Sequence, residues 1–298
     1  MKIVVGTRGS NLALIQTNWV VDELKKANPD VEFEVKIIKT KGDLIKDLPL
    51  DKIGDKGLFV KEIEKSLLNK EIDMAVHSMK DMPSYLPEGL KFASSPKRED
   101  PRDVLIFKEG YKSIEDLPKG ARIGTGSKRR KYQLLKHRPD LEIVPIRGNI
   151  ETRIKKIETE NLDGVVLAAS GLKRAGLEEK IDYYIPTDIM LPAPAQGILA
   201  LEIRENDEET ESIINSIKDD TTKVQIDAER GFLIGVNGSC HIPMGAYCDI
   251  DGDKIKLTGL YGDGEGKKII IKSQEGTIED APKIGYELAK SVLKEFEK

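Results

Sequence analysis

The chain has 298 residues, of which 39% are hydrophobic and 34% are charged, so it is long enough for two or three domains with sizeable cores. Its 48 basic and 52 acidic residues leave a formal net charge of −4, which argues against general nucleic-acid binding, because that function needs a basic surface. No secretory segment and no bilayer-length apolar run is present, so we expect a cytoplasmic protein without membrane contact. The two cysteines make no disulfide framework, and the three histidines lack the spacing of a metal site.

Short apolar runs alternate with amphipathic stretches through the first two-thirds of the chain. Helical spacing of apolar residues predicts helices, and short apolar or alternating runs predict strands. In chain order, the predicted elements are strand 2–6, helix 11–26, strand 34–39, helix 58–69, strand 73–77, strand 121–124, helix 127–137, strand 142–146, helix 149–159, strand 165–169, helix 172–175 and strand 198–203. We expect Leu14, Trp19, Val20 and Leu24 on the buried side of the first helix. This alternation is typical of the α/β class with parallel sheets.

The last third of the chain has a different pattern. A helix at 224–234 precedes three alternating runs, and an amphipathic helix at 281–296 follows them. Gly and Asp turns separate the runs 245–250, 254–261 and 267–272, which predicts an antiparallel meander in a small α+β domain. The segments 96–101 and 191–197 are typical of crossings between domains. We therefore predict domain 1 at 1–97 plus 198–218, domain 2 at 98–197 and domain 3 at 219–298.

Polar and basic residues follow the predicted strands at the points where the strands end. These segments are 7–10 (TRGS), 78–81 (SMKD), 125–130 (TGSKRR), 147–149 (RGN) and 170–174 (SGLKR). Ligands of parallel α/β sheets bind beyond the carboxyl ends of the strands, where helix N-termini and arginine side chains favour anions. The pattern therefore predicts a cleft for a ligand with many carboxylates or phosphates. The segment 124–127 lacks the spacing of a Walker loop and the third glycine of a dinucleotide site.

Three single residues carry possible chemistry, and each also has a plain structural explanation. Asp81 could stabilise a cation or accept hydrogen bonds from N–H groups, but the residues around it by themselves favour a turn or cap role. His77 is typical of a packed strand residue rather than of a base. Cys240 lies between glycines and a proline in a loop where an exposed thiol is available for reaction, although an inert small hydrophobe is the alternative. Cys248 lies in an alternating strand, and we expect it to be buried.

Several longer motifs together resemble one family. They are 54–62 (GDKGLFVKE), 76–83 (VHSMKDMP), 98–103 (REDPRD), 141–153, 171–174 (GLKR), 194–197 (PAQG) and the loop around Cys240. In this order they resemble the porphobilinogen deaminases (hydroxymethylbilane synthases), and the resemblance covers nearly the whole chain. It implies two periplasmic-binding-protein-like lobes with mixed, mostly parallel sheets, plus a small α+β C-terminal domain.

The resemblance also implies a function. It implies a transferase of tetrapyrrole and heme biosynthesis with a dipyrromethane cofactor linked covalently through Cys240. Four porphobilinogen molecules would condense head to tail on this primer with loss of ammonia, and hydrolysis would release the linear tetrapyrrole hydroxymethylbilane. We expect a cytoplasmic monomer whose partners are porphobilinogen and the growing oligopyrrole, without nucleic acid, membrane or metal.

Site residues follow from the same resemblance, position by position. The catalytic residues would be Asp81 and Lys80. The residues that bind the cofactor would be Cys240, Asp81, Lys80, Ser78, Thr125, Ser127, Arg129, Arg130, Arg147 and Gly148. The residues that bind the substrate would be Arg8, Ser10, Lys52, Lys56, Phe59, Arg153, Arg174 and Gln196. Phe59 would pack over the cofactor rings. Independently of the resemblance, the segment 41–56 is rich in Gly, Asp and Lys, and we hypothesise that Asp43 belongs to a lid there.

The chain departs from the family pattern at Gly126 and Lys128, where many relatives carry Ser and Leu. Three other functions fit part of the sequence. A non-catalytic two-lobed binding protein for a carboxylate-rich small molecule would use the same arginines, but it would not need Cys240. An effector domain of a transcription regulator would normally adjoin a helix-turn-helix segment, and none is evident. A phosphate-dependent transferase is disfavoured by the absence of a Walker loop.

Overall fold

The computed structural model describes residues 1–40, 42, 60–238 and 242–298 of the chain. These residues divide into two compact units, Met1–Arg98 with Ile198–Lys223 and Glu99–Gly197 with Val224–Lys298. The chain thus passes into the second unit after Arg98 and returns to the first after Gly197. None of the described helices is both long and apolar enough to cross a membrane.

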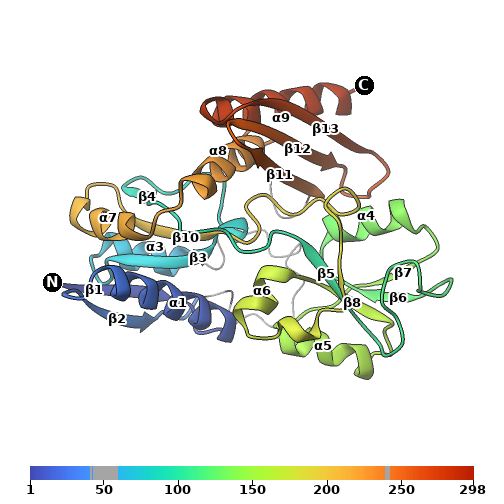
Figure 1. Cartoon of the computed structure of the whole chain (residues 1–298), viewed down its shortest axis with the longest axis horizontal. Helices are drawn as coiled ribbons and strands as arrows, with labels where there is room; N and C mark the ends of the chain where they lie inside the picture. The colour runs from blue at the N-terminus through green and yellow to red at the C-terminus, as the bar shows by residue number, and fades with distance from the viewer. Residues whose placement is uncertain (41, 43–59, 239–241) are drawn as a thin grey trace. The chain divides into compact units, whose positions relative to one another are not determined.

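The first unit is built on a five-stranded sheet in the order β2-β1-β3-β10-β4 (Figure 1). Its strands are β1 (Lys2–Thr7), β2 (Glu32–Ile37), β3 (Met74–Ser78), β4 (Leu90–Phe92) and β10 (Leu199–Arg204). β1 pairs in parallel with β2 and β3, whereas β10 runs antiparallel to both β3 and β4. The helical elements are α1 (Asn11–Ala27), α3 (Lys61–Leu68), η2 (Met79–Asp81), α7 (Glu208–Ile214) and η4 (Asn215–Ile217).

Each face of this sheet has its own apolar core. On the α1 face, Val20 and Leu24 pack with strand residues such as Met74 and Val76. On the opposite face, a smaller cluster joins α3 to Ala75 of β3. Residues 75 and 77 of β3 therefore face α3, because alternate residues of a strand point to opposite sides of the sheet.

The second unit contains a sheet of the same plan, in the order β7-β6-β8-β5-β9. Its strands are β5 (Asp103–Phe107), β6 (Arg122–Gly124), β7 (Glu142–Val144), β8 (Gly164–Ala168) and β9 (Tyr183–Tyr184). β6 is parallel to β7 and β8, and β5 is antiparallel to β8 and β9. The helical elements are α4 (Lys128–His137), α5 (Ile150–Thr159), α6 (Ala169–Arg174) and η3 (Glu178–Lys180).

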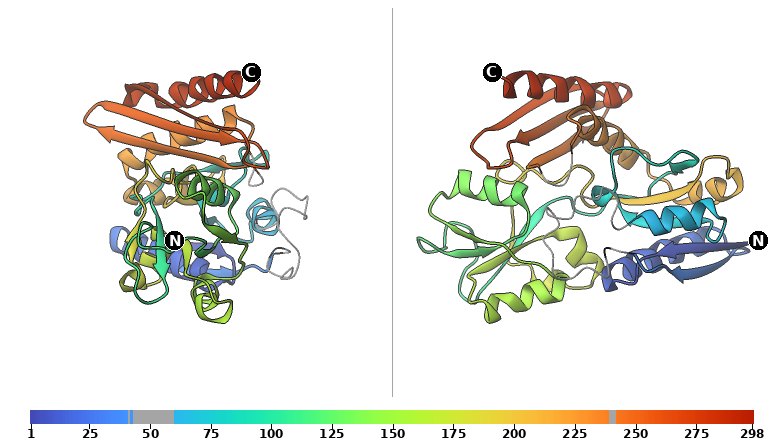
Figure 2. Two further views of the ribbon diagram at one scale, coloured as in Figure 1. Left: turned by 90° about the vertical axis from the view of Figure 1, so that its right-hand side faces the viewer. Right: turned by 180° about the vertical axis from the view of Figure 1, so that it is seen from behind.

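The C-terminal part of the chain forms an antiparallel sheet in the order β11-β12-β13, with two helices packed on it. Its elements are α8 (Asp220–Gly235), β11 (Met244–Asp251), β12 (Lys254–Gly262), β13 (Ile269–Thr277), η5 (Ile278–Asp280) and α9 (Ala281–Phe296). Figure 2 shows α9 lying along the sheet. The two helices meet at glycines, since a Cβ on Gly285 would lie 2.3 Å from the carbonyl oxygen of Ala228.

The predicted fold class is confirmed: two mixed, mostly parallel sheets and a small α+β part are present. The prediction missed β4, β5, β9 and α7. It was wrong for Trp19, whose side chain is exposed although the helical spacing places it beside the apolar stripe. Residues 58 and 59 of the predicted helix 58–69 lie outside the described residues, and α3 begins at Lys61. The division into three domains at the predicted boundaries stays a prediction.

Candidate active site

Polar residues gather where β1 and β3 end in the first unit. Arg8 follows β1, and Ser10 caps α1 by accepting a hydrogen bond from the Ala13 N–H at 3.3 Å. Ser78 ends β3, and its hydroxyl lies 3.1 Å from Nε2 of Gln16 on α1. Because β1 and β3 are parallel neighbours, the three predicted residues share one edge of the sheet.

The predicted catalytic residues lie on η2, the single helical turn that follows β3. Asp81 is exposed and Lys80 is half-buried. Met79 is 1% exposed, and its N–H donates to the Ile198 carbonyl at 3.0 Å, while the Met82 N–H donates back to the Met79 carbonyl at 3.1 Å. The turn is therefore anchored through its buried methionines and presents the Asp81 carboxylate to solvent.

Strand ends also gather predicted residues in the second unit. Thr125 follows β6, is buried, and accepts a hydrogen bond from the Ser127 N–H at 3.3 Å. Ser127 caps α4 by accepting from the Arg130 N–H at 3.4 Å. The Thr125 N–H donates to the Val144 carbonyl at 2.9 Å, which joins the ends of β6 and β7.

The residues after β7 and β8 complete this edge. Gly148 has a φ of +123°, a backbone conformation that residues with a side chain rarely adopt. Its carbonyl accepts a hydrogen bond from Nε of Arg153 at 2.7 Å. Arg147, beside Gly148, is half-buried. Arg174 ends α6 and donates from Nη2 to the Gly197 carbonyl at 2.7 Å, and burial lowers the pKa of its guanidinium to about 10. The ends of β6, β7 and β8 thus bring the predicted binding residues of this unit to one side of the sheet.

Arg129 and Arg130 converge on one buried carboxylate, that of Asp103 at the start of β5. Nη1 of Arg129 lies 2.6 Å from Oδ2 of Asp103, and Nη2 of Arg130 lies 2.7 Å from Oδ1. Gln196 is also fully buried and donates to the same Oδ1 at 3.0 Å. We call these four residues the Asp103 cluster.

The charges of the Asp103 cluster are strongly coupled. Burial by itself would raise the pKa of Asp103, but the guanidiniums of Arg129 and Arg130 outweigh it and hold that pKa well below its usual range. Burial lowers the pKa of Arg129, against the attraction of Asp103. Two cations around one anion leave a positive excess beside the capped start of α4, where an anionic ligand is favoured. The sequence prediction missed Asp103 as a partner of these arginines. The signal that could have indicated it is a single acidic residue at the start of the apolar run DVLIF.

Five predicted residues lie outside the described part of the chain. They are Asp43, Lys52, Lys56, Phe59 and Cys240. Cys248 is fully buried in β11, as expected, and its N–H donates to Oε1 of Glu229 at 2.9 Å.

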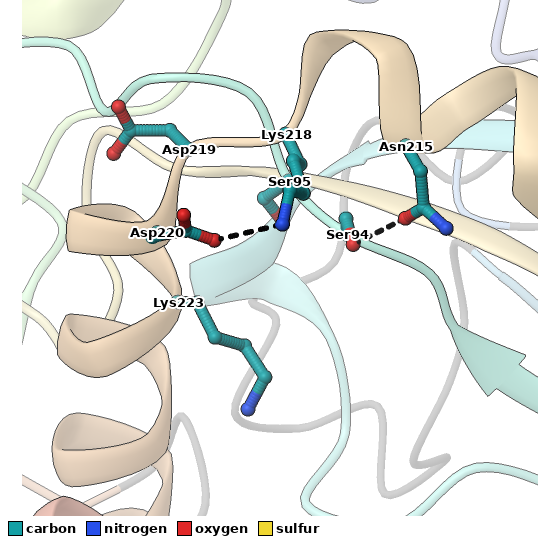
Figure 3. A pocket seen from close by; sticks show the side chains of 7 residues that line it. All are labelled: Ser94, Ser95, Asn215, Lys218, Asp219, Asp220 and Lys223. Atoms are coloured by element: carbon teal, nitrogen blue, oxygen red, sulfur yellow. Dashed lines mark hydrogen bonds and ion pairs between the residues drawn. The ribbon is translucent and has the colours of Figure 1, made fainter. Parts of the chain in front are cut away.

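The first unit also has a surface hollow of about 320 Å³ near the start of α8. Figure 3 shows that its polar side chains bind one another: the Ser94 hydroxyl donates to Oδ1 of Asn215, and Lys218 pairs with Asp220. No predicted site residue lines this hollow.

Two family profiles match this chain. The profile described as "Porphobilinogen deaminase, dipyromethane cofactor binding domain" matches residues 3–212, and the profile "Porphobilinogen deaminase, C-terminal domain" matches residues 223–294. The chain belongs to the porphobilinogen deaminase family.

Curated members of the porphobilinogen deaminase family are similar over the full length. The porphobilinogen deaminase of Clostridioides difficile (strain 630) is 69% identical, and the match covers 100% of this chain and 99% of that protein. The porphobilinogen deaminase of Clostridium novyi (strain NT) is 64% identical, with 99% and 100% covered. Among solved structures, the VFT2 domain of Bordetella pertussis BvgS has a TM-score of 0.43 at 17% identity, covering 76% of this chain and 91% of that domain.

The second unit of this porphobilinogen deaminase family member offers hydrogen-bond donors for a dipyrromethane that bears carboxylates. Arg129 donates from Nη1 to Asp103 and to the Leu191 carbonyl, which fixes its guanidinium beside the capped start of α4. Thr125, Ser127 and the basic residues of the neighbouring strand ends supply donors of the type that carboxylates need. The donor set of the second unit therefore fits such a group.

Proposed function

We propose that this chain is a transferase that condenses four porphobilinogen molecules head to tail, with loss of ammonia, and releases the linear tetrapyrrole hydroxymethylbilane by hydrolysis. One observation carries the proposal: the exposed carboxylate of Asp81 stands on an anchored turn at the same sheet edge as the polar ends of β1 and β3. This arrangement offers a fixed negative charge to a reaction in which positive charge develops.

Asp81 is the proposed catalytic residue. When ammonia leaves porphobilinogen, positive charge spreads over the pyrrole, and a carboxylate held nearby stabilises it. The same oxygens can accept hydrogen bonds from pyrrole N–H groups. Lys80, its neighbour on the turn, binds a substrate carboxylate or takes part in proton transfer.

The residues at and near the strand ends, most of them basic or hydroxyl residues, are the proposed binding residues. Each pyrrole of the family substrate carries an acetate and a propionate, so the growing chain is strongly anionic, and arginine holds carboxylates through paired hydrogen bonds. In the first unit these residues are Arg8, Ser10 and Ser78. In the second unit they are Thr125, Ser127, Arg129, Arg130, Arg147, Gly148, Arg153, Arg174 and Gln196. The binding and lid roles of Lys52, Lys56, Phe59 and Asp43 belong to the same proposal.

Cys240 is the proposed attachment residue of the dipyrromethane. The chain has two cysteines, and Cys248 is fully buried in β11, which makes its thiol a poor choice for attachment. The attached dipyrromethane would supply the pyrrole carbon onto which substrate is condensed. The Asp103 cluster supports this proposal, because its positive excess would bind carboxylates of the primer. We further propose that the protein acts as a cytoplasmic monomer.

The experiment that tests the proposal is intact-mass measurement of the purified protein beside Cys240→Ser and Cys248→Ser. A dipyrrole excess is expected in wild type and in Cys248→Ser, and the bare sequence mass in Cys240→Ser. Incubation with porphobilinogen should then add pyrrole masses to the first two proteins only. A wild-type protein that binds porphobilinogen without gaining covalent mass would support the rival two-lobed binding protein.

A further inference from the structure

A buried acidic cluster lies directly behind the catalytic turn of the first unit. His77, the residue before Ser78 on β3, has a side chain that is only 5% exposed. Its Nε2 lies 3.0 Å from Oε2 of Glu202 on β10, whose side chain is fully buried. His77 pairs in register with Ala200, so Glu202 is its diagonal neighbour on the same face of the sheet.

A second carboxyl group, that of Glu64, is buried on the same side. α3 packs against β3 and β10, and Glu64 of α3 is 7% exposed. Burial, and next the negative charge of Glu202, raise the pKa of Glu64 to about 7. Lys61 and His77 act in the opposite direction, so the charged groups around Glu64 come from α3, β3 and β10.

Burying this cluster costs folding free energy. Oε1 of Glu202 is buried and has no hydrogen-bond partner within the described chain. A buried carboxyl oxygen without a hydrogen-bond partner costs free energy, because burial removes the water that would otherwise bind it. Stability alone therefore does not account for two acids and an imidazole where the neighbouring Ala75 and Ala200 are apolar. In some proteins, buried polar groups of this kind are retained because they fix one conformation among several.

The conformation next to the cluster is that of the turn 78–81. Two contacts hold this turn: the Met79 N–H donates to the Ile198 carbonyl, and the Ser78 hydroxyl accepts from Gln16. Both lie after His77 along the chain, so they do not fix the strand that leads into the turn. We infer that the His77–Glu202 pair fixes the path by which β3 enters the turn, which makes His77 a positioning residue for Asp81. The inference rests on the proposed function of Asp81.

The test compares the steady-state kinetics of His77→Phe, Glu202→Gln and His77→Gln in the full-length protein, with porphobilinogen as substrate. We expect His77→Phe and Glu202→Gln to lower kcat by about ten- to a hundredfold, as small misplacements of reacting groups do. KM should hardly change, because the pair touches no substrate. His77→Gln keeps an N–H donor toward Glu202 and should restore most of kcat.

The matched control is His137→Phe. His137 also faces a glutamate, with Nε2 3.3 Å from Oε1 of Glu115, but on the surface of the second unit. This variant should match the wild type in kcat and KM. An unchanged kcat in His77→Phe and Glu202→Gln, a failure of His77→Gln to recover activity, or the loss of folding in all three variants would each overturn the inference.

Failure of the proposed function is distinguishable from failure of this inference. A wild-type protein that gains no pyrrole mass would refute the function. Hydrogen exchange at the amides of the turn 78–81 still tests the positioning role in that case, because exchange should be faster in His77→Phe than in His137→Phe. Equal exchange in the two variants would refute it.

Discussion

The two five-stranded sheets share one strand plan but bury opposite kinds of charge. Behind the turn of the first unit lie two carboxyl groups, Glu64 and Glu202, with one imidazole. Behind the edge of the second unit lie two guanidiniums with one carboxylate, that of Asp103. The excess is therefore acidic in the first unit and basic in the second.

The pKa shifts show how each excess is accommodated. The pKa of Glu64 is raised to about 7 by burial and by the charge of Glu202, so this carboxyl holds its proton to a higher pH than an exposed glutamate does. The pKa of Asp103 is held well below its usual range, so the basic cluster keeps its charges and shares one anion between two cations. A carboxylate can escape burial by protonation near neutral pH, whereas an arginine cannot, and this difference decides which sheet can offer a permanent positive field to an anionic chain.

The difference between the two units is tested most directly by removing one carboxylate from each, the exposed Asp81 and the buried Asp103. Asp81→Asn should keep the fold and lower kcat by at least about a hundredfold, because it removes the charge that stabilises the transition state. Steady-state turnover of porphobilinogen measures the loss, with the exposed Asp30→Asn in the same unit as the control. A near-normal rate in Asp81→Asn would rule out the charge-stabilising role.

Asp103→Asn should act on stability instead. It leaves Arg129 and Arg130 buried without their anion, which costs about 3–5 kcal/mol of unfolding free energy. Denaturant unfolding measures the cost. Asp100→Asn breaks the nearby pair with Arg102, whose side chain is 42% exposed, and should cost no more than about 1 kcal/mol. Similar costs for the two variants would show that the two guanidiniums do not depend on Asp103.

The smallest expected effect is a pH dependence of stability in the first unit. The folded-state pKa of Glu64 is raised from 4.5 to about 7, so its contribution is present below pH 4.5 and is lost as pH rises through 7. Glu64→Gln removes this ionisation. At pH 9 the wild type should therefore have lost about 1–3 kcal/mol relative to the variant, compared with their difference at pH 4.5.

Melting temperatures of wild type and Glu64→Gln across pH 4.5–9 measure this dependence. Glu88→Gln, at an exposed position of the same unit, is the control and should leave the wild-type profile unchanged. Parallel profiles for wild type and Glu64→Gln would mean that Glu64 does not titrate near neutrality.

Local sequence patterns predicted the elements whose signals are long and periodic. The closing helix 281–296 was placed at both ends, because its apolar stripe is unbroken. β4 and β9 were missed because three and two residues are too short for a period to emerge. β5 was missed because it begins with a charged residue, Asp103, whose buried carboxylate depends on partners that lie 26, 27 and 93 residues away along the chain.

The candidate site divides in the same way. Strand ends predicted which loops meet, since parallel strands bring their carboxyl ends to one edge. Local sequence patterns could not predict which side chains are buried or which residues they pair with. Nothing near Arg129 and Arg130 in the sequence indicates that both side chains turn inward to Asp103. His77 was correctly predicted as a packed strand residue, but its partner Glu202 lies 125 residues away along the chain.

The chain leaves the first unit after Arg98 and returns to it with β10, and this order of segments affects folding during synthesis. β10 lies between β3 and β4, so the first sheet cannot close until residue 204 has been made. The second sheet needs only β5 to β9, which are complete at Tyr184. Domains usually fold from the N-terminus as the ribosome delivers them. In this protein we expect the second sheet to be complete first, while β1 and β3 still lack β10, their partner strand in the first sheet.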